Sequence, residues 1–396
     1  MVDLSVEIAG VKFKNPIVVA SATPTMHAKG MKKGIDGGAG AVIAKSLFGE
    51  AGKLGRQFPR PRFKLLDYRE YPGYPEKLPH SFTLRSLEEC SSFDYETYMK
   101  DINKAKDLIG DSGVVIASLS GSSMDEWLTM VKMVNETKAD WVELNNSCPF
   151  AADMGICMGA GAVDLTYQFV KACKEIIKKP FSVKITPQTN DPVTIAKQVE
   201  QAGANAVNMS ARLSGTIIDI ETAKPYPFGA IGGWGGPYLL GYGLKLVGAA
   251  AKELKIPIIA GLGTWDWQDI IRYIMVGASL VQSGAGIMLQ GYKVSQKWQD
   301  HISAWMEGKG YKSLADIRGL ALPNMLKTAE VPRKPTNIGM VIDTTKCTKC
   351  GVCLRSCFYD AITVTKAGAV INPKACDVCG MCSEVCPAYA PHLVHK

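Results

Sequence analysis

The sequence predicts an α/β fold, a (β/α)8 barrel followed by a small α+β ferredoxin-type unit. Eight short apolar runs alternate with glycine-rich or polar turns and with stretches of helical periodicity. A segment rich in proline and lysine follows them, and two cysteine runs of equal spacing end the chain. The predicted parts are therefore a barrel over residues 1–320, a linker over 321–337 and a cysteine-rich unit over 338–396.

The barrel prediction rests on the order of short segments along the chain. Residues 3–14 alternate apolar and polar side chains around Ala9-Gly10, which predicts a hairpin. A helix is expected over 163–178, with Leu165, Phe169, Val170, Cys173 and Ile177 on one face, and another opens at Asp191 around Val193, Ile195 and Val199. The eight runs predicted as strands cover residues 16–22, 41–47, 113–120, 141–147, 181–187, 206–212, 257–263 and 280–286.

One connection, residues 48–112, is too long for a simple crossover, so we expect a lid-like insertion over the barrel mouth. Its aromatic and basic content suits a lid that faces an anionic ligand. The side chains concerned are Arg56, Arg60, Arg62, Tyr68, Tyr71, Tyr74 and Arg85.

The cysteine runs read Cys347-x-x-Cys350-x-x-Cys353-x-x-x-Cys357 and Cys376-x-x-Cys379-x-x-Cys382-x-x-x-Cys386. This is the spacing of a ferredoxin with two [4Fe-4S] clusters, in which the fourth cysteine of each run binds the other cluster. We therefore assign Cys347, Cys350, Cys353 and Cys386 to one cluster, and Cys376, Cys379, Cys382 and Cys357 to the second.

Zinc and disulfides are the alternative uses of these cysteines. Two zinc sites would more naturally take a pair of x-x-spaced cysteines from each run, which leaves the third and fourth cysteines without a role. Disulfides require an oxidising compartment. Clusters transfer single electrons, so the rest of the chain should use or supply them.

Composition places the chain among ordinary globular proteins, with 396 residues, 47% hydrophobic and 21% charged. The first sixteen residues lack an apolar core segment, which predicts no signal peptide. Twelve cysteines without an export signal favour a reducing cytoplasm. The charge-free stretches after Lys224 and Arg272 are broken by glycine and polar residues, so no membrane span is expected.

The formal net charge of +8 counts cysteine as neutral. Eight thiolates around two cluster cores of +2 would subtract about four charges, which leaves the loaded protein only mildly basic. Nucleic-acid binding is therefore not predicted, and a basic patch could equally dock an acidic redox partner.

Barrel enzymes place their sites at the C-terminal ends of the strands. Three cations stand there, Lys45, Lys184 and Arg212, and a buried lysine requires an anion or a strong acceptor nearby. Glycines follow strands seven and eight, where such barrels bind phosphate. The glycines could be tight turns alone, but with the lysines they favour a phosphate-bearing cofactor. They are Gly261, Gly263 and Gly284.

No glycine fingerprint of a nicotinamide domain is complete, since Gly159-Ala-Gly161 and Gly284-Ala-Gly286 are only fragments. An electron-transfer chain without such a domain needs an external electron donor. We expect an NAD(P)H-oxidising flavoprotein subunit or a soluble ferredoxin.

Several motifs resemble the flavin-dependent dihydroorotate and dihydropyrimidine dehydrogenases: Asn15-Pro16 to Ser21-Ala22, Ile43-Ala-Lys45, Glu143-Leu-Asn145-Asn-Ser147-Cys148-Pro149 and Val183-Lys184-Ile-Thr-Pro187. The order of barrel and two-cluster ferredoxin is similar to the C-terminal part of the dihydropyrimidine enzymes and to the corresponding bacterial subunit. The resemblance implies FMN and a homodimer. It places FMN contacts at Ala20, Ser21, Lys45, Ser46, Asn145, Lys184, Ser210, Gly236, Gly261, Gly263, Gly284 and Ala285.

The resemblance also implies that Cys148 is the proton donor on the substrate side of the flavin. Hydride is delivered to one carbon of a polarised C=C bond, and a thiol on the opposite face protonates the neighbouring carbon. The alternative is a small buried apolar residue, a common fate of free cysteine. Cys157 is a competing candidate, and Cys90 and Cys173 are expected to be structural.

The substrate contacts depart from the family pattern. Leu84-Arg85-Ser86 and Ala211-Arg212 stand where the pyrimidine enzymes have Asn-x-Glu and Asn-Thr. Uracil needs acceptors for its N–H groups, and arginine supplies donors only. We therefore expect Arg212, with Arg85 and Asn145, to bind a carboxylate on an unsaturated or aromatic acid. The alternative is that Arg212 pairs with Asp219.

The leading prediction is an oxidoreductase that reduces an activated C=C bond of a small anionic substrate, with electrons relayed by the clusters to FMN. The first alternative is dihydropyrimidine dehydrogenase activity itself. A second, from a different class, is an electron-transfer subunit whose barrel binds flavin only to relay electrons.

Overall fold

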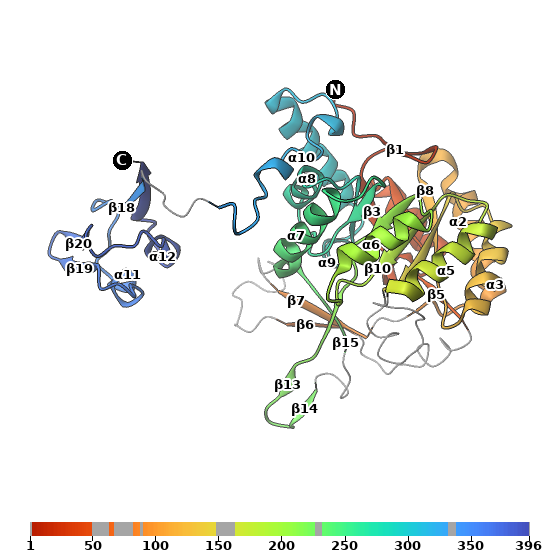
Figure 1. Ribbon diagram of the computed structural model, residues 1–396, viewed down its shortest axis with the longest axis horizontal. Coiled ribbons are helices and arrows are strands. Elements are labelled where there is room, and N and C mark those ends of the chain that lie inside the picture. Colours follow the sequence, from red (N-terminus) through yellow and green to blue (C-terminus); the bar gives the residue numbers. More distant parts are fainter. Residues whose placement is uncertain are drawn as a thin grey trace. The chain divides into compact units, whose positions relative to one another are not determined.

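A computed structural model describes residues 2–49, 63–66, 82–87, 90–147, 163–225, 232–331 and 338–395 (Figure 1). The chain divides into two compact units, Met1–Met325 and Leu326–Lys396. Ala321 hydrogen-bonds to Met275 of the first unit, N to O at 2.9 Å. The predicted linker over 321–337 lies partly outside the described residues, so its limits stay a prediction.

The first unit is a closed barrel of parallel strands, as predicted. Each strand pairs with the next in chain order, and the last returns to the first through Val281 opposite Ile17. The strands are β3 (Ile17–Val19), β4 (Ala41–Ile43), β8 (Val114–Ser120), β9 (Trp141–Asn146), β10 (Phe181–Ile185), β11 (Ala206–Asn208), β16 (Ile258–Ala260) and β17 (Leu280–Ser283).

Helices connect these strands and cover the barrel (Figure 1). A strand buried on both faces reads as a continuous apolar run, which is why the eight runs were visible in the sequence. The helices are α1 (Ala28–Asp36), α2 (Tyr95–Ile109), α3 (Met124–Asn135), α5 (Val163–Ile176), α6 (Pro192–Gln201), α7 (Leu240–Ala251), α8 (Trp267–Met275), α9 (Ala285–Gln290) and α10 (Val294–Lys309).

Both predicted helices form, with one error in the buried face. Phe169, Val170 and Cys173 of α5 are buried, but Leu165 is 44% exposed, because the buried stripe begins at Thr166, about 100° further round the helix. In α6 the predicted cap is confirmed, since the Asp191 carboxylate accepts hydrogen bonds from the amides of Val193 and Thr194 at 3.1 Å each.

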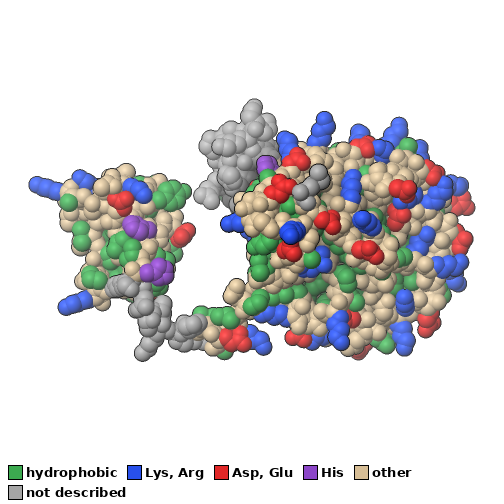
Figure 2. All heavy atoms as spheres, turned by 90° about the horizontal axis from the view of Figure 1, so that it is seen from above, with side chains coloured by type: hydrophobic (Ala, Val, Ile, Leu, Met, Phe, Trp, Pro, Cys, Tyr) green, Lys and Arg blue, Asp and Glu red, His purple; other side chains and the backbone are tan. Residues whose placement is uncertain are grey.

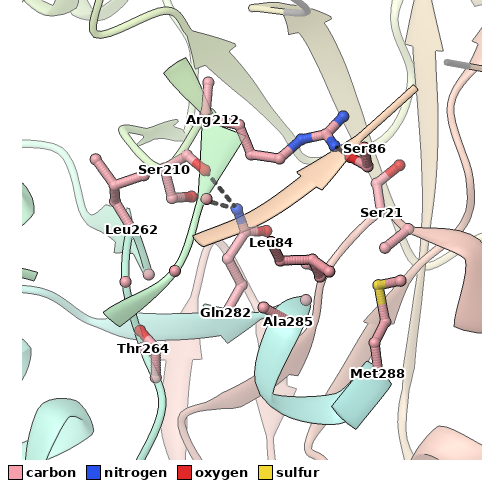
Figure 3. Close-up of a pocket in the computed structure, with 18 of the residues that line it drawn as sticks. Ser21, Leu84, Ser86, Ser210, Arg212, Leu262, Thr264, Gln282, Ala285 and Met288 are labelled. Atoms are coloured by element: carbon pink, nitrogen blue, oxygen red, sulfur yellow. Dashed lines mark hydrogen bonds between the residues drawn. The ribbon is translucent and has the colours of Figure 1, made fainter. Parts of the chain in front are cut away.

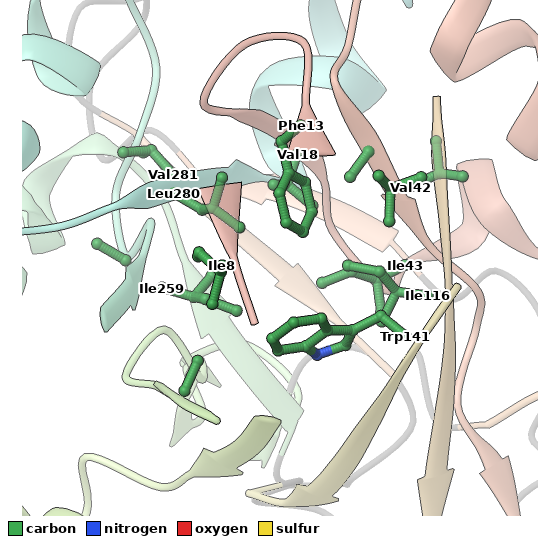
Figure 4. Close-up of a cluster of buried hydrophobic side chains, with 14 of the residues drawn as sticks. Ile8, Phe13, Val18, Val42, Ile43, Ile116, Trp141, Ile259, Leu280 and Val281 are labelled. Carbon is green, nitrogen blue, oxygen red and sulfur yellow. The ribbon is translucent and has the colours of Figure 1, made fainter. Parts of the chain in front are cut away.

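The N-terminal hairpin forms as predicted and closes one end of the barrel. β1 (Val6–Ile8) and β2 (Val11–Phe13) pair around Ala9 and Gly10, both with positive φ, as a tight two-residue turn requires. The Phe13 ring meets Trp141, the first residue of β9, edge to face at 6.2 Å between centroids. Ile8 and Phe13 thus pack among buried apolar side chains of the barrel strands (Figure 4).

A second, antiparallel sheet accompanies the other end of the barrel. It contains β6 (Phe63–Leu66) and β7 (Thr83–Ser86) from the predicted insertion, with β12 (Leu213–Gly215) and β15 (Gly232–Gly235) from the connection after β11. The insertion is shorter than 48–112, because α2 packs against α1 and β8 as an ordinary barrel helix. Shorter strands nearby are β5 (Leu47–Phe48), β13 (Ile218–Asp219) and β14 (Lys224–Pro225).

The second unit is built from two small hairpin-like pairs and two short helices. β18 (Ile338–Ile342) pairs with β21 (Pro391–His395), and β19 (Ile362–Thr365) pairs with β20 (Gly368–Ile371). The helices are α11 (Val352–Arg355) and α12 (Met381–Glu384). Its apolar core is small and includes two of the predicted cluster ligands, Cys353 and Cys382.

Within the described ranges, no helix has the length and apolarity needed to cross a lipid bilayer. On the face seen in Figure 2, the Lys and Arg side chains of the first unit are interspersed with Asp and Glu. This mixed surface differs from the continuous basic stripe that marks an electrostatic nucleic-acid footprint.

Candidate active site and cluster sites

A cavity of about 1010 Å³ lies at the C-terminal ends of the barrel strands. Phe63, Leu84 and Ser86 of the second sheet line it together with the strand ends, so that sheet forms one wall. Figure 3 shows Leu84 and Ser86 on one strand, facing residues of the barrel rim.

The structure brings together all twelve residues predicted to contact a cofactor. Each lines this one cavity, although they come from eight different parts of the chain. They are Ala20, Ser21, Lys45, Ser46, Asn145, Lys184, Ser210, Gly236, Gly261, Gly263, Gly284 and Ala285.

Two buried lysines give the cavity a positive character. Lys45 is 3% exposed and Lys184 is 9% exposed. Lys184 lies in register between Asn145 of β9 and Asn208 of β11, so its side chain shares their side of the sheet. Ammonium groups held this deeply favour an anionic or strongly accepting ligand.

The glycines after β16 occupy positions that no other residue could take. Gly261 has φ +147°, and a Cβ there would lie 2.1 Å from the Gln282 carbonyl oxygen. Gly263 has φ +81°, and a Cβ there would lie 2.4 Å from the Leu240 amide nitrogen. Bare backbone at both positions lets a phosphate approach the amide groups closely.

Two cavity-lining side chains hold buried polar atoms that a ligand can satisfy. Thr264 Oγ1 and Gln282 Oε1 are buried, and within the described part of the chain neither has a hydrogen-bond partner. Native proteins rarely leave such groups unsatisfied. Together with the lysines and glycines, these atoms fit a ligand with an anionic end and a polar ring, which matches FMN.

Arg212 lines the cavity, whereas Arg85 does not. Arg212 Nη1 donates a hydrogen bond to Ser86 Oγ, and Figure 3 shows the guanidinium directed toward Ser86. Arg85 is fully buried between Leu84 and Ser86 on β7, and strand alternation turns it away from the face that they present. The prediction of Arg85 as a substrate contact is therefore wrong.

Asp219, the alternative partner considered for Arg212, is engaged locally. Its carboxylate accepts hydrogen bonds from the amides of Glu221 and Thr222 at 2.9 and 3.0 Å. The Thr222 amide is the main cause of the lowered pKa of this carboxyl group. Asp219 therefore forms its hydrogen bonds within its own turn rather than with Arg212.

The predicted proton donor Cys148 and its competitor Cys157 lie outside the described residues. Ser147, directly before Cys148, is 2% exposed and lines the cavity. Its amide and hydroxyl both donate to Asn145 Oδ1, at 3.2 and 2.7 Å. The residue that precedes Cys148 in the sequence is therefore held in the cavity wall.

Cys90 and Cys173 are buried, as expected for structural residues. Cys173 belongs to the apolar core on α5, and burial raises the pKa of its thiol to about 12. Such a thiol stays protonated and inert at neutral pH.

The cluster cysteines line two separate cavities in the second unit. Cys347, Cys350, Cys353 and Cys386 line one, and Cys357, Cys376, Cys379 and Cys382 line the other. Both groups cross between the runs in the way that the spacing predicts. In each cavity the fourth thiol comes from the opposite run.

Backbone amides point at several of these sulfur atoms. The amides of Ala361, Ala369, Val378 and Ala390 donate to Cys357, Cys347, Cys376 and Cys386, each at 3.4 Å. Hydrogen bonds to the sulfurs stabilise the reduced, more negative state of a cluster. Both cavities are therefore prepared for electron-accepting groups.

The fold and these sites define a class: barrel oxidoreductases that bind a flavin phosphate at the strand ends and carry a two-cluster ferredoxin unit. The family model described as dihydroorotate dehydrogenase matches residues 91–306, and the 4Fe-4S dicluster domain matches residues 339–387. The chain belongs to the dihydroorotate dehydrogenase family. FMN is the cofactor of its barrel, and two [4Fe-4S] clusters are those of its second unit.

Curated relatives in this family share nearly their whole length with the chain. The protein named dihydroorotate dehydrogenase B (NAD(+)), catalytic subunit, from Pyrococcus abyssi is 31% identical over 319 residues, which are 81% of this chain and 99% of that protein. The protein of the same name from Methanothermobacter thermautotrophicus is 31% identical over 322 residues, 80% of this chain and 98% of its own. The protein of the same name from Caldicellulosiruptor bescii is 28% identical to this chain over 317 residues.

The sequence did not single out Thr264, Gln282 or Ser86 as site residues. Gln282 lies on β17, two positions before Gly284. Because side chains alternate along a strand, this spacing could have indicated that Gln282 faces the same side as the glycine. Thr264 directly follows Gly263 in the same turn. Ser86 offered no signal, since its place depends on the pairing of two distant segments in the second sheet.

Proposed function

We propose that the chain is the catalytic subunit of an oxidoreductase that interconverts a C–C and a C=C bond in a small cyclic acid. The observation that carries the proposal is the single cavity. It combines two buried lysines, two glycine turns suited to phosphate, Arg212, and Ser147, the residue that precedes Cys148 in the sequence. FMN, when bound, supplies the hydride chemistry and exchanges electrons with the clusters.

The twelve cavity residues would hold FMN. Gly261, Gly263 and Gly284 face the phosphate, because bare amides there need an anion. Lys45 and Lys184 face the flavin ring or the substrate, where their buried charge stabilises negative charge that develops during reduction. Thr264 and Gln282 then gain the partners that they lack within the described chain.

Arg212 would bind the substrate carboxylate. Its bond to Ser86 holds the guanidinium at the wall formed by the second sheet. A planar guanidinium matches a carboxylate through two parallel hydrogen bonds. The relatives are named for dihydroorotate, a ring that carries a carboxylate, so the orotate pair is the substrate we favour within the class of unsaturated or aromatic acids.

Cys148 would move the proton, and Asn145 would position the substrate beside it. In the reducing direction the thiol donates to the carbon next to the hydride acceptor, and in the oxidising direction the thiolate removes that proton. The Asn145 carboxamide also holds Ser147, which fixes the backbone immediately before the cysteine.

The clusters would connect this site to an external partner. Cys347, Cys350, Cys353 and Cys386 bind one cluster in this proposal, and Cys357, Cys376, Cys379 and Cys382 bind the other. The relatives' name specifies NAD(+) and a catalytic subunit, which favours an NAD-linked flavoprotein subunit over a soluble ferredoxin as partner. A homodimer accompanies this proposal.

A Cys148→Ala variant tests the function, with Cys157→Ala as its control. We expect Cys148→Ala to lose about 10²- to 10⁴-fold in turnover of the acid, while the clusters and flavin still reduce and still pass electrons to an artificial acceptor. Cys157→Ala should keep turnover. Equal turnover in wild type and Cys148→Ala would instead indicate a relay subunit.

A substrate panel separates the acid from the pyrimidine alternative. The purified holoprotein is offered orotate and dihydroorotate, then uracil, then an unsaturated acid without a pyrimidine ring. The proposal expects turnover that requires a carboxylate. Brisk uracil reduction with no response to the acids would replace the proposal with dihydropyrimidine dehydrogenase activity.

A further inference from the structure

A buried carboxylate beneath the cavity, Glu143, organises a hydrogen-bond network without itself lining the cavity. It lies on β9 between Trp141 and Asn145 and is fully buried. Its Oε1 accepts from Ser118 Oγ at 3.1 Å, and its Oε2 accepts from Asn208 Nδ2 at 2.6 Å. A carboxylate can only accept hydrogen bonds, so both neighbours must donate toward it.

One arm of the network runs from Glu143 toward β4. Because the Ser118 hydroxyl proton points at Glu143, Ser118 Oγ must accept from Ser46 Oγ, 2.9 Å away. Ser46 has then used its own proton, so it accepts from Asn145 Nδ2 at 2.8 Å and from Ser21 Oγ at 3.1 Å. The Asn145 amide is thereby turned so that its oxygen faces Ser147.

The other arm runs from Glu143 toward β17. Since Asn208 Nδ2 points at Glu143, Asn208 Oδ1 faces Ser210 and accepts its hydroxyl proton. Because Ser210 Oγ has donated its proton, it can only accept a further hydrogen bond, and Gln282 Nε2 donates to it (Figure 3). This fixes the Gln282 amide with Nε2 toward Ser210 and Oε1 pointing away from it. Oε1 is the buried atom that has no hydrogen-bond partner within the described chain.

We propose that Glu143 is a positioning residue that sets the direction of every hydrogen bond in both arms. In consequence Gln282 presents an acceptor to the bound ring, and Asn145 keeps its oxygen toward Ser147, the residue that precedes Cys148 in the sequence. The acceptor at Gln282 suits an N–H group, such as the ring N–H of a flavin or of a pyrimidine. The inference rests on the proposed binding of FMN in this cavity.

The test is Glu143→Gln, which keeps the shape but replaces one acceptor with a donor. One arm must then reverse its direction or lose a hydrogen bond. We expect the folded variant to bind FMN about tenfold more weakly in reconstitution of the apoprotein, and its flavin reduction potential to shift from that of wild type. Glu136→Gln changes an exposed glutamate at the C-cap of α3, before β9, and should match wild type in both readouts.

A second variant keeps the test decisive if Glu143→Gln does not fold. Ser118→Ala interrupts the β4 arm, leaves the carboxylate intact and changes no cavity-lining residue, so it should weaken FMN binding in the same direction. Wild-type affinity and potential in Glu143→Gln, or in Ser118→Ala where the former does not fold, would overturn the inference. A wild-type protein that binds no FMN would overturn the proposed function as well, which separates the two failures.

Discussion

In the proposed site, Arg212 is the single residue that most directly sets the substrate class. Arg212→Met keeps the length and removes the charge, so we expect the KM for a carboxylate substrate to rise about 10- to 100-fold, because hydrogen bonds between charged groups are lost. The measurement is steady-state kinetics with the acid. Arg212→Lys should recover part of the loss, since it restores charge without the planar fork.

An unchanged KM in Arg212→Met would assign this side chain to the second sheet rather than to substrate. The bond between Arg212 and Ser86 would then serve only to hold that sheet.

Charged residues beside the two cluster cavities differ in sign. Lys349 lines the cavity of Cys347, and Asp377 lines that of Cys376. Because nearby positive charge favours the reduced, more negative cluster, Asp377→Asn should raise the potential of one cluster and Lys349→Gln should lower that of the other. A potentiometric titration followed by electron paramagnetic resonance measures both. Solvent screening keeps the shifts small, and a shift of the same sign in both variants would contradict the prediction.

At the scale of single residues, sequence reasoning found those whose place follows from strand ends. The barrel geometry brings Ser21, Lys45, Asn145, Lys184 and Gly261 together whatever the loops do. Arg85 was misplaced because its facing depends on pairing within the second sheet, which local pattern does not encode. Glu143 stood in a recognised motif, but its role emerges only from the neighbouring strands that surround it.

Among the elements, α6 offers a clear test of how local sequence stabilises the barrel. The Asp191 side chain caps it, and the Thr194 hydroxyl is the main cause of the lowered pKa of this carboxyl group. Asp191→Ala should reduce the free energy of unfolding by about 1 kcal/mol at neutral pH, and Asp191→Asn by less. Chemical denaturation of the three proteins measures both differences.

The same cap carries a pH dependence of defined sign. A depressed carboxyl pKa contributes stability above its ordinary value of 3.8, and this contribution is lost as the pH falls through the lowered value. The gap between wild type and Asp191→Ala should therefore shrink below about pH 4. A gap that stays constant across this range would mean that the charge plays no part in the cap.

The observed limits of strands and helices show which features the apolar runs predict and which they miss. The strand Ile17–Val19 is shorter than the apolar run over 16–22 that predicted it. The chain leaves the hydrogen-bonded ladder after Val19 because its next residues line the cavity. The helix α2 escaped prediction because it follows an aromatic, basic insertion that was read as one segment up to residue 112. Its cap, Asp94 accepting from the Thr97 amide at 2.7 Å, was the local signal that could have separated them.

At the scale of the whole molecule, the chain joins two units that the proposed electron path would connect. The relatives match about four fifths of this chain with almost all of their own length, which leaves a share comparable to the second unit without a counterpart. The cysteine spacing predicted how the thiols of that unit are grouped, because ligand order along the chain determines which thiols meet. The orientation of the two units needs contacts that sequence patterns do not specify.

The most direct test of the electron path is an anaerobic reductive titration of the purified holoprotein. We expect about four electrons per chain, two for one FMN and one for each of two clusters, with about eight iron atoms. Adding the oxidised acid to the fully reduced protein should then reoxidise the flavin and both clusters. Clusters that stay reduced while the flavin reoxidises would contradict a single path through the chain.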